Sequence, residues 1–259
     1  MLTLADEDSR LPYVRRGCGP PLLLVQGTAA TYLHWGERFL SLLAASFDVV
    51  AYDHRGVGRS APVRGPFTVP DLADDAAGML DVVGWRSAHV VGVSMGGAVA
   101  AELALRHPDR VESLFLGCTG PTSPDRVPAA LTSAVVRGDL SRTLRNVFRL
   151  GVKDPDRVRP GAWEEYRDAT LARPVDPRTI ALQIGAVARH RSADRLHRIA
   201  VPTSVVHGDA DRIVPPEAGE RLAAAISGAS FTLLGAGHFF WLEEPEQVAQ
   251  LVAKLAMDA

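Results

Sequence analysis

The chain has 259 residues, of which 47% are hydrophobic and 22% are charged, and its formal net charge is −2. This length and apolar content are enough for one α/β domain with an insertion, and they exclude a disordered chain. The nearly balanced charge supplies no basic field that would attract nucleic acid or an anionic membrane surface.

The cysteines, Cys18 and Cys118, and the scattered histidines form no disulfide framework and no spacing typical of a metal site. The segment 1–16 carries acidic side chains where a secretory signal would have a basic region before an apolar one. No apolar run approaches the roughly 20 residues of a membrane span. We therefore expect a soluble, cytoplasmic protein that acts on a small molecule and binds neither nucleic acid nor membrane. Its oligomeric state stays open, a homodimer included.

Short apolar runs alternate with helical patterns along most of the chain. The runs are continuous rather than alternating, which is typical of parallel strands covered on both faces. In chain order we predict strand 21–26, helix 35–45, strand 47–52, helix 69–83, strand 88–93, helix 98–106, strand 111–118, strand 203–207, helix 216–226, strand 230–234 and helix 245–257. This order predicts an α/β fold with a doubly wound, mostly parallel sheet.

The alternation breaks between residues 121 and 200, where no strand-like run occurs. Proline-punctuated helical patterns replace it, at 129–137, 140–150, 162–171 and 177–189. We interpret 121–200 as a helical cap inserted into an α/β core made of 1–120 and 201–259. The segment holds 15 Lys and Arg against 9 Asp and Glu, a charge of +6, so the rest carries −8. Most such charge lies on solvated helix faces, although a basic cap over a cleft would also attract an anionic substrate.

The most informative motif is Gly92-Val93-Ser94-Met95-Gly96, which separates a β-branched apolar run from an alanine-rich segment. It predicts a strand, a sharp turn and a helix, with Ser94 at the apex. The glycines on either side let strand and helix pass without a side-chain clash, and the turn holds the serine in a strained backbone position. Ser94 is therefore presented as a nucleophile would be.

A serine hydroxyl is a poor nucleophile at neutral pH, so it needs a base within hydrogen-bond reach and a third group to orient that base. Two segments that follow predicted strands offer these groups. The first, 207–215, contains Asp209 and Asp211, and the second ends at His238. Both lie at the carboxyl ends of parallel strands, where ligands bind in open α/β sheets.

With this order of serine, aspartate and histidine, and with the glycine-rich loop 52–60, the chain resembles the α/β-hydrolase fold superfamily. Within it the chain is similar to capped serine hydrolases such as 3-oxoadipate enol-lactonases, lactone hydrolases and polyketide methyl esterases. The resemblance covers nearly the whole sheet domain, and it implies that Ser94 is the nucleophile, Asp211 the acid and His238 the base. Asp209 is the competing acid, with a turn as its other role. The family spacing of glycine, two residues and aspartate favours Asp211.

Acyl transfer also needs donors aimed at the developing oxyanion. Met95 supplies one backbone N–H from the start of a helix, whose dipole acts in the same sense. The resemblance implies the N–H of Thr28 as the other. The commoner family form has His-Gly where this chain has Gln26-Gly27. Since the donor belongs to the main chain, this substitution need not abolish the oxyanion hole, but it leaves the donor residue open.

The expected function is hydrolysis of a carboxylic ester or lactone through an acyl-enzyme intermediate, with no metal or organic cofactor. The same triad on this fold also supports hydrolysis of amide or carbon-carbon bonds and formation of peracids, because a fold does not fix a chemistry. A ligand-binding receptor with negligible turnover is a further alternative. The resemblance implies a mainly structural role for Asp53, His54 and Arg55.

Overall fold

The computed structural model describes residues 3–4, 11–121 and 140–259 of the chain. Within these residues eight strands form one sheet in the order β1-β2-β4-β3-β5-β6-β7-β8. The first two strands pair antiparallel, and β2 also runs antiparallel to β4, whereas all other neighbours are parallel. The predicted mostly parallel α/β sheet is thereby confirmed.

The bounds of the elements are as follows. The strands are β1 (Thr3–Leu4), β2 (Tyr13–Arg16), β3 (Pro21–Val25), β4 (Asp48–Tyr52), β5 (Ala88–Val93), β6 (Val111–Gly117), β7 (Thr203–Gly208) and β8 (Ser230–Leu234). The α-helices are α1 (Glu37–Ala44), α2 (Val69–Val82), α3 (Met95–Arg106), α5 (Leu140–Gly151), α6 (Ala162–Ala172), α7 (Pro177–Arg189), α8 (Pro216–Ala225), α9 (Phe240–Glu243) and α10 (Pro245–Met257). Short 3-10 helices lie at Tyr32–Trp35, Pro108–Arg110 and Leu196–Arg198.

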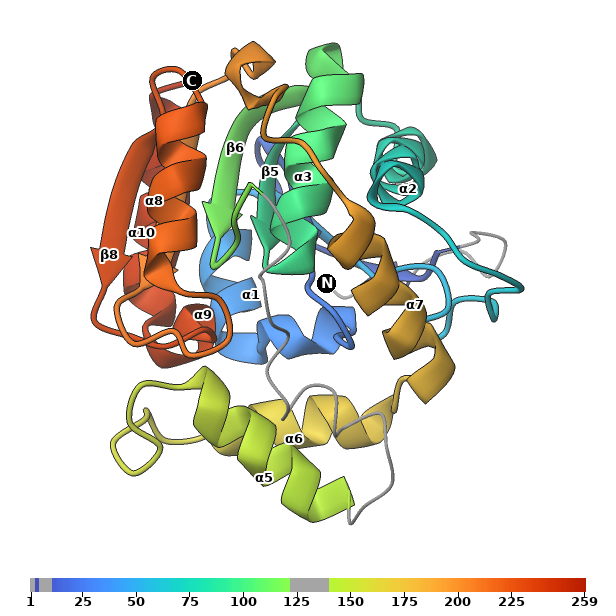
Figure 1. Ribbon diagram of the computed structural model, residues 1–259, viewed down its shortest axis with the longest axis vertical. Coiled ribbons are helices and arrows are strands. Elements are labelled where there is room, and N and C mark those ends of the chain that lie inside the picture. The colour runs from blue at the N-terminus through green and yellow to red at the C-terminus, as the bar shows by residue number, and fades with distance from the viewer. Residues whose placement is uncertain (1–2, 5–10, 122–139) are drawn as a thin grey trace.

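The sheet is covered on both faces, as the continuous apolar strands predict. Alternate residues of β3 enter different cores: Leu23 packs in one, while Leu22 and Leu24 pack in the other. Helices α2 and α3 cover the first face, and α1 and α10 pack together over the second (Figure 1). The strands β1 and β2 are missing from the sequence prediction because β2 reads Tyr-Val-Arg-Arg and only Val14 in it is buried.

Helix α3 begins at Met95, three residues before its predicted start. The glycines that obscured this start are required by close packing rather than by a turn. A methyl group on Gly96 would lie 2.0 Å from the carbonyl oxygen of Val25, and one on Gly92 would lie 2.3 Å from that of Gly96. The end of β3, the strand β5 and the first turn of α3 therefore approach more closely than any side chain would allow.

Helices α5, α6 and α7 connect β6 to β7, close to their predicted ranges. The predicted helix 129–137 lies outside the described residues. The arrows of β5 and β6 point toward α5 and α6, so these helices lie beyond the carboxyl ends of the parallel strands (Figure 1). In the described part of the chain no helix has both the length and the apolar character needed to cross a bilayer. We refer to α5, α6 and α7 together as the insertion helices.

Candidate active site

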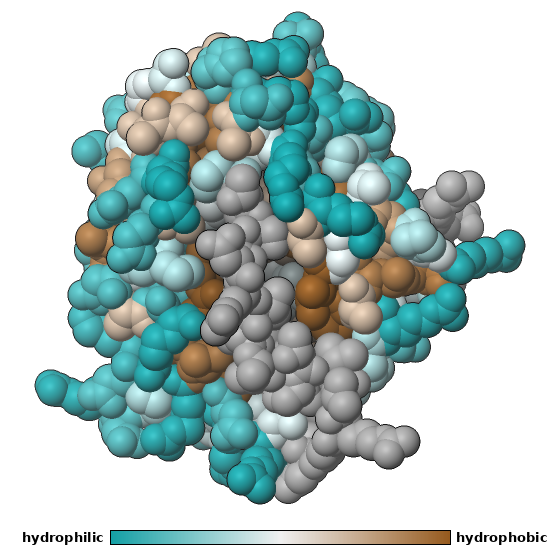
Figure 2. All heavy atoms as spheres, viewed as in Figure 1, coloured by the Kyte–Doolittle hydropathy of each residue, from teal (hydrophilic) through white to brown (hydrophobic). Residues whose placement is uncertain are grey.

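A cavity of about 400 Å³ lies between the carboxyl edge of the sheet and the insertion helices. Apolar side chains form most of its wall, and hydrophobic residues also gather on either side of the middle of the face seen in Figure 2, inside a mostly hydrophilic rim. The polar residues among those that line it are Gln26, Thr28, His34, Ser94, Thr119, Thr143, Tyr166, Thr170, His190 and His238. This edge is the one at which ligands bind in doubly wound sheets.

Ser94 stands between the last residue of β5 and the first of α3. Its backbone has φ 55° and ψ −122°, a conformation that residues other than glycine rarely adopt. The backbone N–H of Ser94 donates to the carbonyl of Gly117 at 2.9 Å, which ties the turn to the end of β6. A methyl group on Gly27 would lie 3.6 Å from Ser94 Oγ, so the loop after β3 passes directly beside this hydroxyl.

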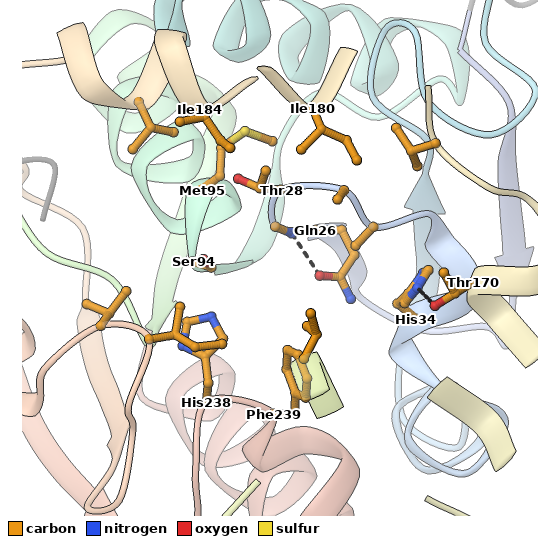
Figure 3. A pocket seen from close by; sticks show the side chains of 18 of the residues that line it. Gln26, Thr28, His34, Ser94, Met95, Thr170, Ile180, Ile184, His238 and Phe239 are labelled. Carbon is orange, nitrogen blue, oxygen red and sulfur yellow. Dashed lines mark hydrogen bonds between the residues drawn. The ribbon is translucent and has the colours of Figure 1, made fainter. Parts of the chain in front are cut away.

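Asp211 and His238 meet although 27 residues separate them in the chain. The distance from His238 Nδ1 to Asp211 Oδ2 is 2.7 Å, and both side chains are buried. Because the carboxylate accepts this hydrogen bond, Nδ1 carries the hydrogen and Nε2 keeps its lone pair. His238 lines the same cavity as Ser94, and Figure 3 shows the two side chains facing the same space. The hydrogen bond to Asp211 thus leaves the other ring nitrogen, Nε2, to act as a base toward a group in the cavity.

The carboxylate of Asp211 is held by four donors. Its Oδ1 accepts the backbone N–H groups of Ile213 and Val214 at 2.8 and 2.9 Å. Its Oδ2 lies 3.2 Å from Nε2 of His207 as well as 2.7 Å from His238. Burial alone would favour the neutral acid, but the electrostatic interaction and hydrogen bonds with the two histidines hold the pKa of Asp211 well below its ordinary value. Asp211 therefore stays ionised at neutral pH.

His207, the penultimate residue of β7, also contacts this carboxylate. It is completely buried, and its Nε2 lies 3.0 Å from the carbonyl oxygen of Val214. Since a carbonyl only accepts, Nε2 carries the hydrogen and shares it with Asp211. Nothing in the residues 207–211 distinguishes this contact from an ordinary buried histidine, so sequence reasoning missed it.

Asp209 occupies a different environment. Its carboxylate is about half exposed and forms a bidentate pair with Lys153 Nζ at 2.8 and 3.0 Å. It does not line the cavity. Of the two candidate acids, the structure brings only Asp211 to His238.

The loop that carries His238 is anchored to the end of α5. The backbone N–H of Gly237 donates to Glu243 Oε1 at 2.7 Å, and that of Lys153 donates to Oε2 of the same carboxylate at 2.9 Å. The N–H of Phe239 donates to the carbonyl of Gly151 at 2.8 Å. The insertion helices are therefore tied directly to the segment that positions the histidine.

The loop 26–30 is held by the side chains of two glutamines, one within the loop and one from α7. The N–H of Gly27 donates to Gln26 Oε1 at 2.7 Å, and that of Ala29 donates to Gln183 Oε1, on α7, at 2.9 Å. Neither the N–H of Thr28 nor that of Met95 has a hydrogen-bond partner among the residues that the structure describes. Two donors are thus available beside Ser94. Gln183 has no sequence signal, because only the packing of α7 brings it here.

His34 also lines the cavity, and both nitrogens of its ring are engaged. Its Nδ1 accepts the N–H of Thr31 at 3.0 Å, and its Nε2 lies 3.0 Å from Thr170 Oγ1. The hydroxyl of Thr170 in turn donates to the carbonyl of Tyr166 at 2.9 Å. Burial lowers the pKa of His34 to about 4, so it is neutral at physiological pH and has no free ring nitrogen for chemistry.

Cys118 adds a group that the sequence spacing did not predict. Within the described residues, its sulfur, a carboxylate oxygen of Asp211 and a ring nitrogen of His238 lie within 4.8 Å of one another. Three atoms of types that can bind a metal are thus close together, but both oxygens of Asp211 are already engaged by N–H donors. Burial raises the pKa of the Cys118 thiol, which keeps it neutral and a poor ligand.

A family model described as the alpha/beta hydrolase fold matches residues 20–245. The chain belongs to the α/β-hydrolase family. It is 30% identical over 243 residues to a poly(3-hydroxyalkanoate) depolymerase of Ectopseudomonas oleovorans, an alignment that covers 90% of this chain and 83% of that protein. Relatives of this kind indicate that it is a hydrolase.

Solved structures of two hydrolases are similar to this family member over nearly its whole length. The enol-lactonase of Burkholderia xenovorans superposes with a TM-score of 0.85 at 27% identity, covering 95% of this chain and 96% of that one. A thermophilic esterase of Thermogutta terrifontis superposes with a TM-score of 0.83 at 27% identity, covering 100% and 98%.

Proposed function

We propose that this α/β hydrolase is a serine hydrolase that cleaves a carboxylic ester or lactone through an acyl-enzyme intermediate. The observation that carries the proposal is the pairing of His238 with a buried, ionised Asp211 at the wall of the cavity that also contains Ser94 on its strained turn. An esterase and an enol-lactonase of the same fold support the choice of ester or lactone.

In the proposed mechanism Ser94 Oγ attacks the substrate carbonyl while His238 Nε2 takes its proton. Asp211 keeps the imidazole in the required tautomer and stabilises the imidazolium that forms. The developing oxyanion accepts hydrogen bonds from the backbone N–H groups of Thr28 and Met95. His238 then gives its proton to the leaving alcohol, activates a water molecule and so releases the acid. These steps use the protein's own side chains and water.

We further propose that the insertion helices, with residues 121–200 as a whole, act as a cap that encloses the small-molecule substrate. They contribute residues from α5, α6 and α7 to the cavity wall, Leu144, Tyr166 and Ile184 among them. Other apolar residues of these helices, Phe148 and Trp163 among them, do not line the cavity and pack against each other.

The proposal is tested by hydrolysis of p-nitrophenyl esters and of neutral lactones. We expect turnover by the wild-type protein and a kcat lowered by about 10⁴-fold or more in Ser94→Ala, because the nucleophile is lost. A phosphonate probe should label Ser94, identified by mass spectrometry. Binding without turnover, or equal turnover by Ser94→Ala, would reject the proposal and favour a receptor or another chemistry.

A further inference from the structure

Gln26 stands where the commoner family form has a histidine, and its side chain is oriented by its own loop. It is 2% exposed. Its Oε1 accepts the backbone N–H of Gly27 at 2.7 Å. Because that N–H needs an acceptor, it fixes which end of the amide is oxygen, and it leaves the NH₂ group on the other side. The backbone of Gln26 is fixed as well, since its carbonyl oxygen lies 2.9 Å from His54 Nε2.

The amide nitrogen of Gln26 has no hydrogen-bond partner in the described part of the chain, although it is buried. Figure 3 shows this nitrogen turned away from Gly27 and into the space that Phe239 and His34 border. Buried donors are nearly always partnered, and each one left without a partner costs free energy, so such a group calls for an explanation. His34 cannot serve as the partner, because both of its ring nitrogens are engaged by Thr31 and Thr170.

The surroundings of this donor restrict what can bind it. The described residues that line the cavity include no Asp, Glu, Lys or Arg. An ionised substrate group would therefore lose its hydration without gaining a counter-charge, which is costly in an apolar site. The Lys and Arg side chains of the segment 121–200 do not line the cavity within the described residues. The positive charge of this segment therefore does not favour an anionic substrate in the cavity.

We infer that Gln26 is a specificity-determining residue whose NH₂ group donates to an uncharged oxygen of the substrate, other than the carbonyl that Ser94 attacks. The favoured substrate is a neutral, mostly apolar ester or lactone with a second acceptor, such as an ether, hydroxyl or keto oxygen. The scissile carbonyl has its own donors in Thr28 and Met95, which leaves the amide of Gln26 for this second oxygen. The inference rests on the proposed function.

The test compares p-nitrophenyl hexanoate with analogues in which an oxygen replaces one methylene at successive positions. For an ether oxygen at one of these positions, we expect the wild type to hydrolyse the ether analogue with a higher kcat/KM than the hexanoate. Gln26→Met should lose this preference. The kcat/KM ratio of ether to hydrocarbon should fall by about twofold to tenfold, the worth of one neutral hydrogen bond. A chain-matched ester that ends in a carboxylate should be the poorest substrate of the set.

Gln183→Met is the matched control. Like Gln26, Gln183 has a buried NH₂ group without a hydrogen-bond partner in the described residues, and its side-chain oxygen accepts a backbone N–H of the loop 26–30. Unlike Gln26, it does not line the cavity. Its replacement should lower kcat/KM for all esters alike and leave the ether preference intact. Gln26→Glu keeps an acceptor for Gly27 and removes the NH₂ group, so it provides a second variant if Gln26→Met does not fold. It too should lose the preference.

The outcomes separate the two proposals. If wild type hydrolyses the esters and Ser94→Ala does not, the proposed function stands whatever Gln26 does. An ether preference that is absent at every position, or that survives in Gln26→Met, would then overturn the role of Gln26 alone. A preference for the ester that ends in a carboxylate would overturn the inference that the favoured substrate is neutral. Failure of every ester and every lactone would reject the proposed function and this inference with it.

Discussion

The loops that follow β4 and β7 carry the same residue types at the same edge of the sheet, yet their aspartates have different hydrogen-bond partners. The loop after β4 contains Asp53 and His54, and the loop after β7 contains Asp211, preceded by His207 at the end of the strand. All four side chains are buried. Only one of these aspartates meets a histidine from another loop.

The difference lies in the donors that each carboxylate faces. Asp53 accepts the backbone N–H groups of Tyr32 at 2.8 Å and Arg59 at 3.4 Å, and burial raises its pKa to about 6. Asp211 faces two backbone N–H groups and two imidazoles, and its pKa lies below the ordinary value. The same residue type thus has a raised pKa in one loop and a lowered pKa in the other. Neighbouring elements, rather than the local motif, decide which.

The largest effect in this comparison is expected at Asp211. Asp211→Asn should lower kcat by about 10³- to 10⁴-fold, because the amide no longer holds His238 in the required tautomer. The measurement is steady-state hydrolysis of a p-nitrophenyl ester at neutral pH.

Asp209→Asn is the control for this change. It removes an exposed pair with Lys153 and should leave kcat within about twofold of wild type, since such pairs contribute little. A large loss in Asp209→Asn together with normal activity in Asp211→Asn would reverse the assignment of the acid.

A smaller effect is expected at His207, which we place as a positioning residue. His207→Leu removes one hydrogen bond to the carboxylate of Asp211 and should lower kcat/KM by about tenfold. His207→Gln retains a donor and should restore part of the activity. A loss of activity that His207→Gln does not relieve would mean that His207 acts only through packing.

The smallest effect on activity and a clear one on stability are expected at Asp53. Its folded-state pKa of about 6 lies above the ordinary value of 3.8. Protonation of Asp53 therefore stabilises the folded state fully below pH 3.8, and this stabilisation is lost as the pH rises through about 6. Asp53→Asn should gain stability relative to wild type between pH 4 and 7, by at most about 3 kcal/mol. Urea unfolding across this range measures the difference. Parallel curves for the two proteins would show that Asp53 is not protonated in the folded state.

The sequence by itself determined the parallel strands of the sheet, the turn at Ser94 and the segments that hold Asp211 and His238. These features are local: apolar runs specify buried strands, and glycines mark the close approach of β5 and α3. The sequence also singled out Gln26 as a departure from the family form, without indicating where its amide would point.

Only the tertiary structure decided which side chains share a hydrogen bond. It separated Asp211 from Asp209, joined His207 to the triad carboxylate, and brought Gln183 from α7 to the loop 26–30. It also produced an uncharged cavity wall, within the described residues, beside a segment of net positive charge. Such contacts join residues far apart in the chain, and no local pattern encodes them because they depend on how whole elements pack.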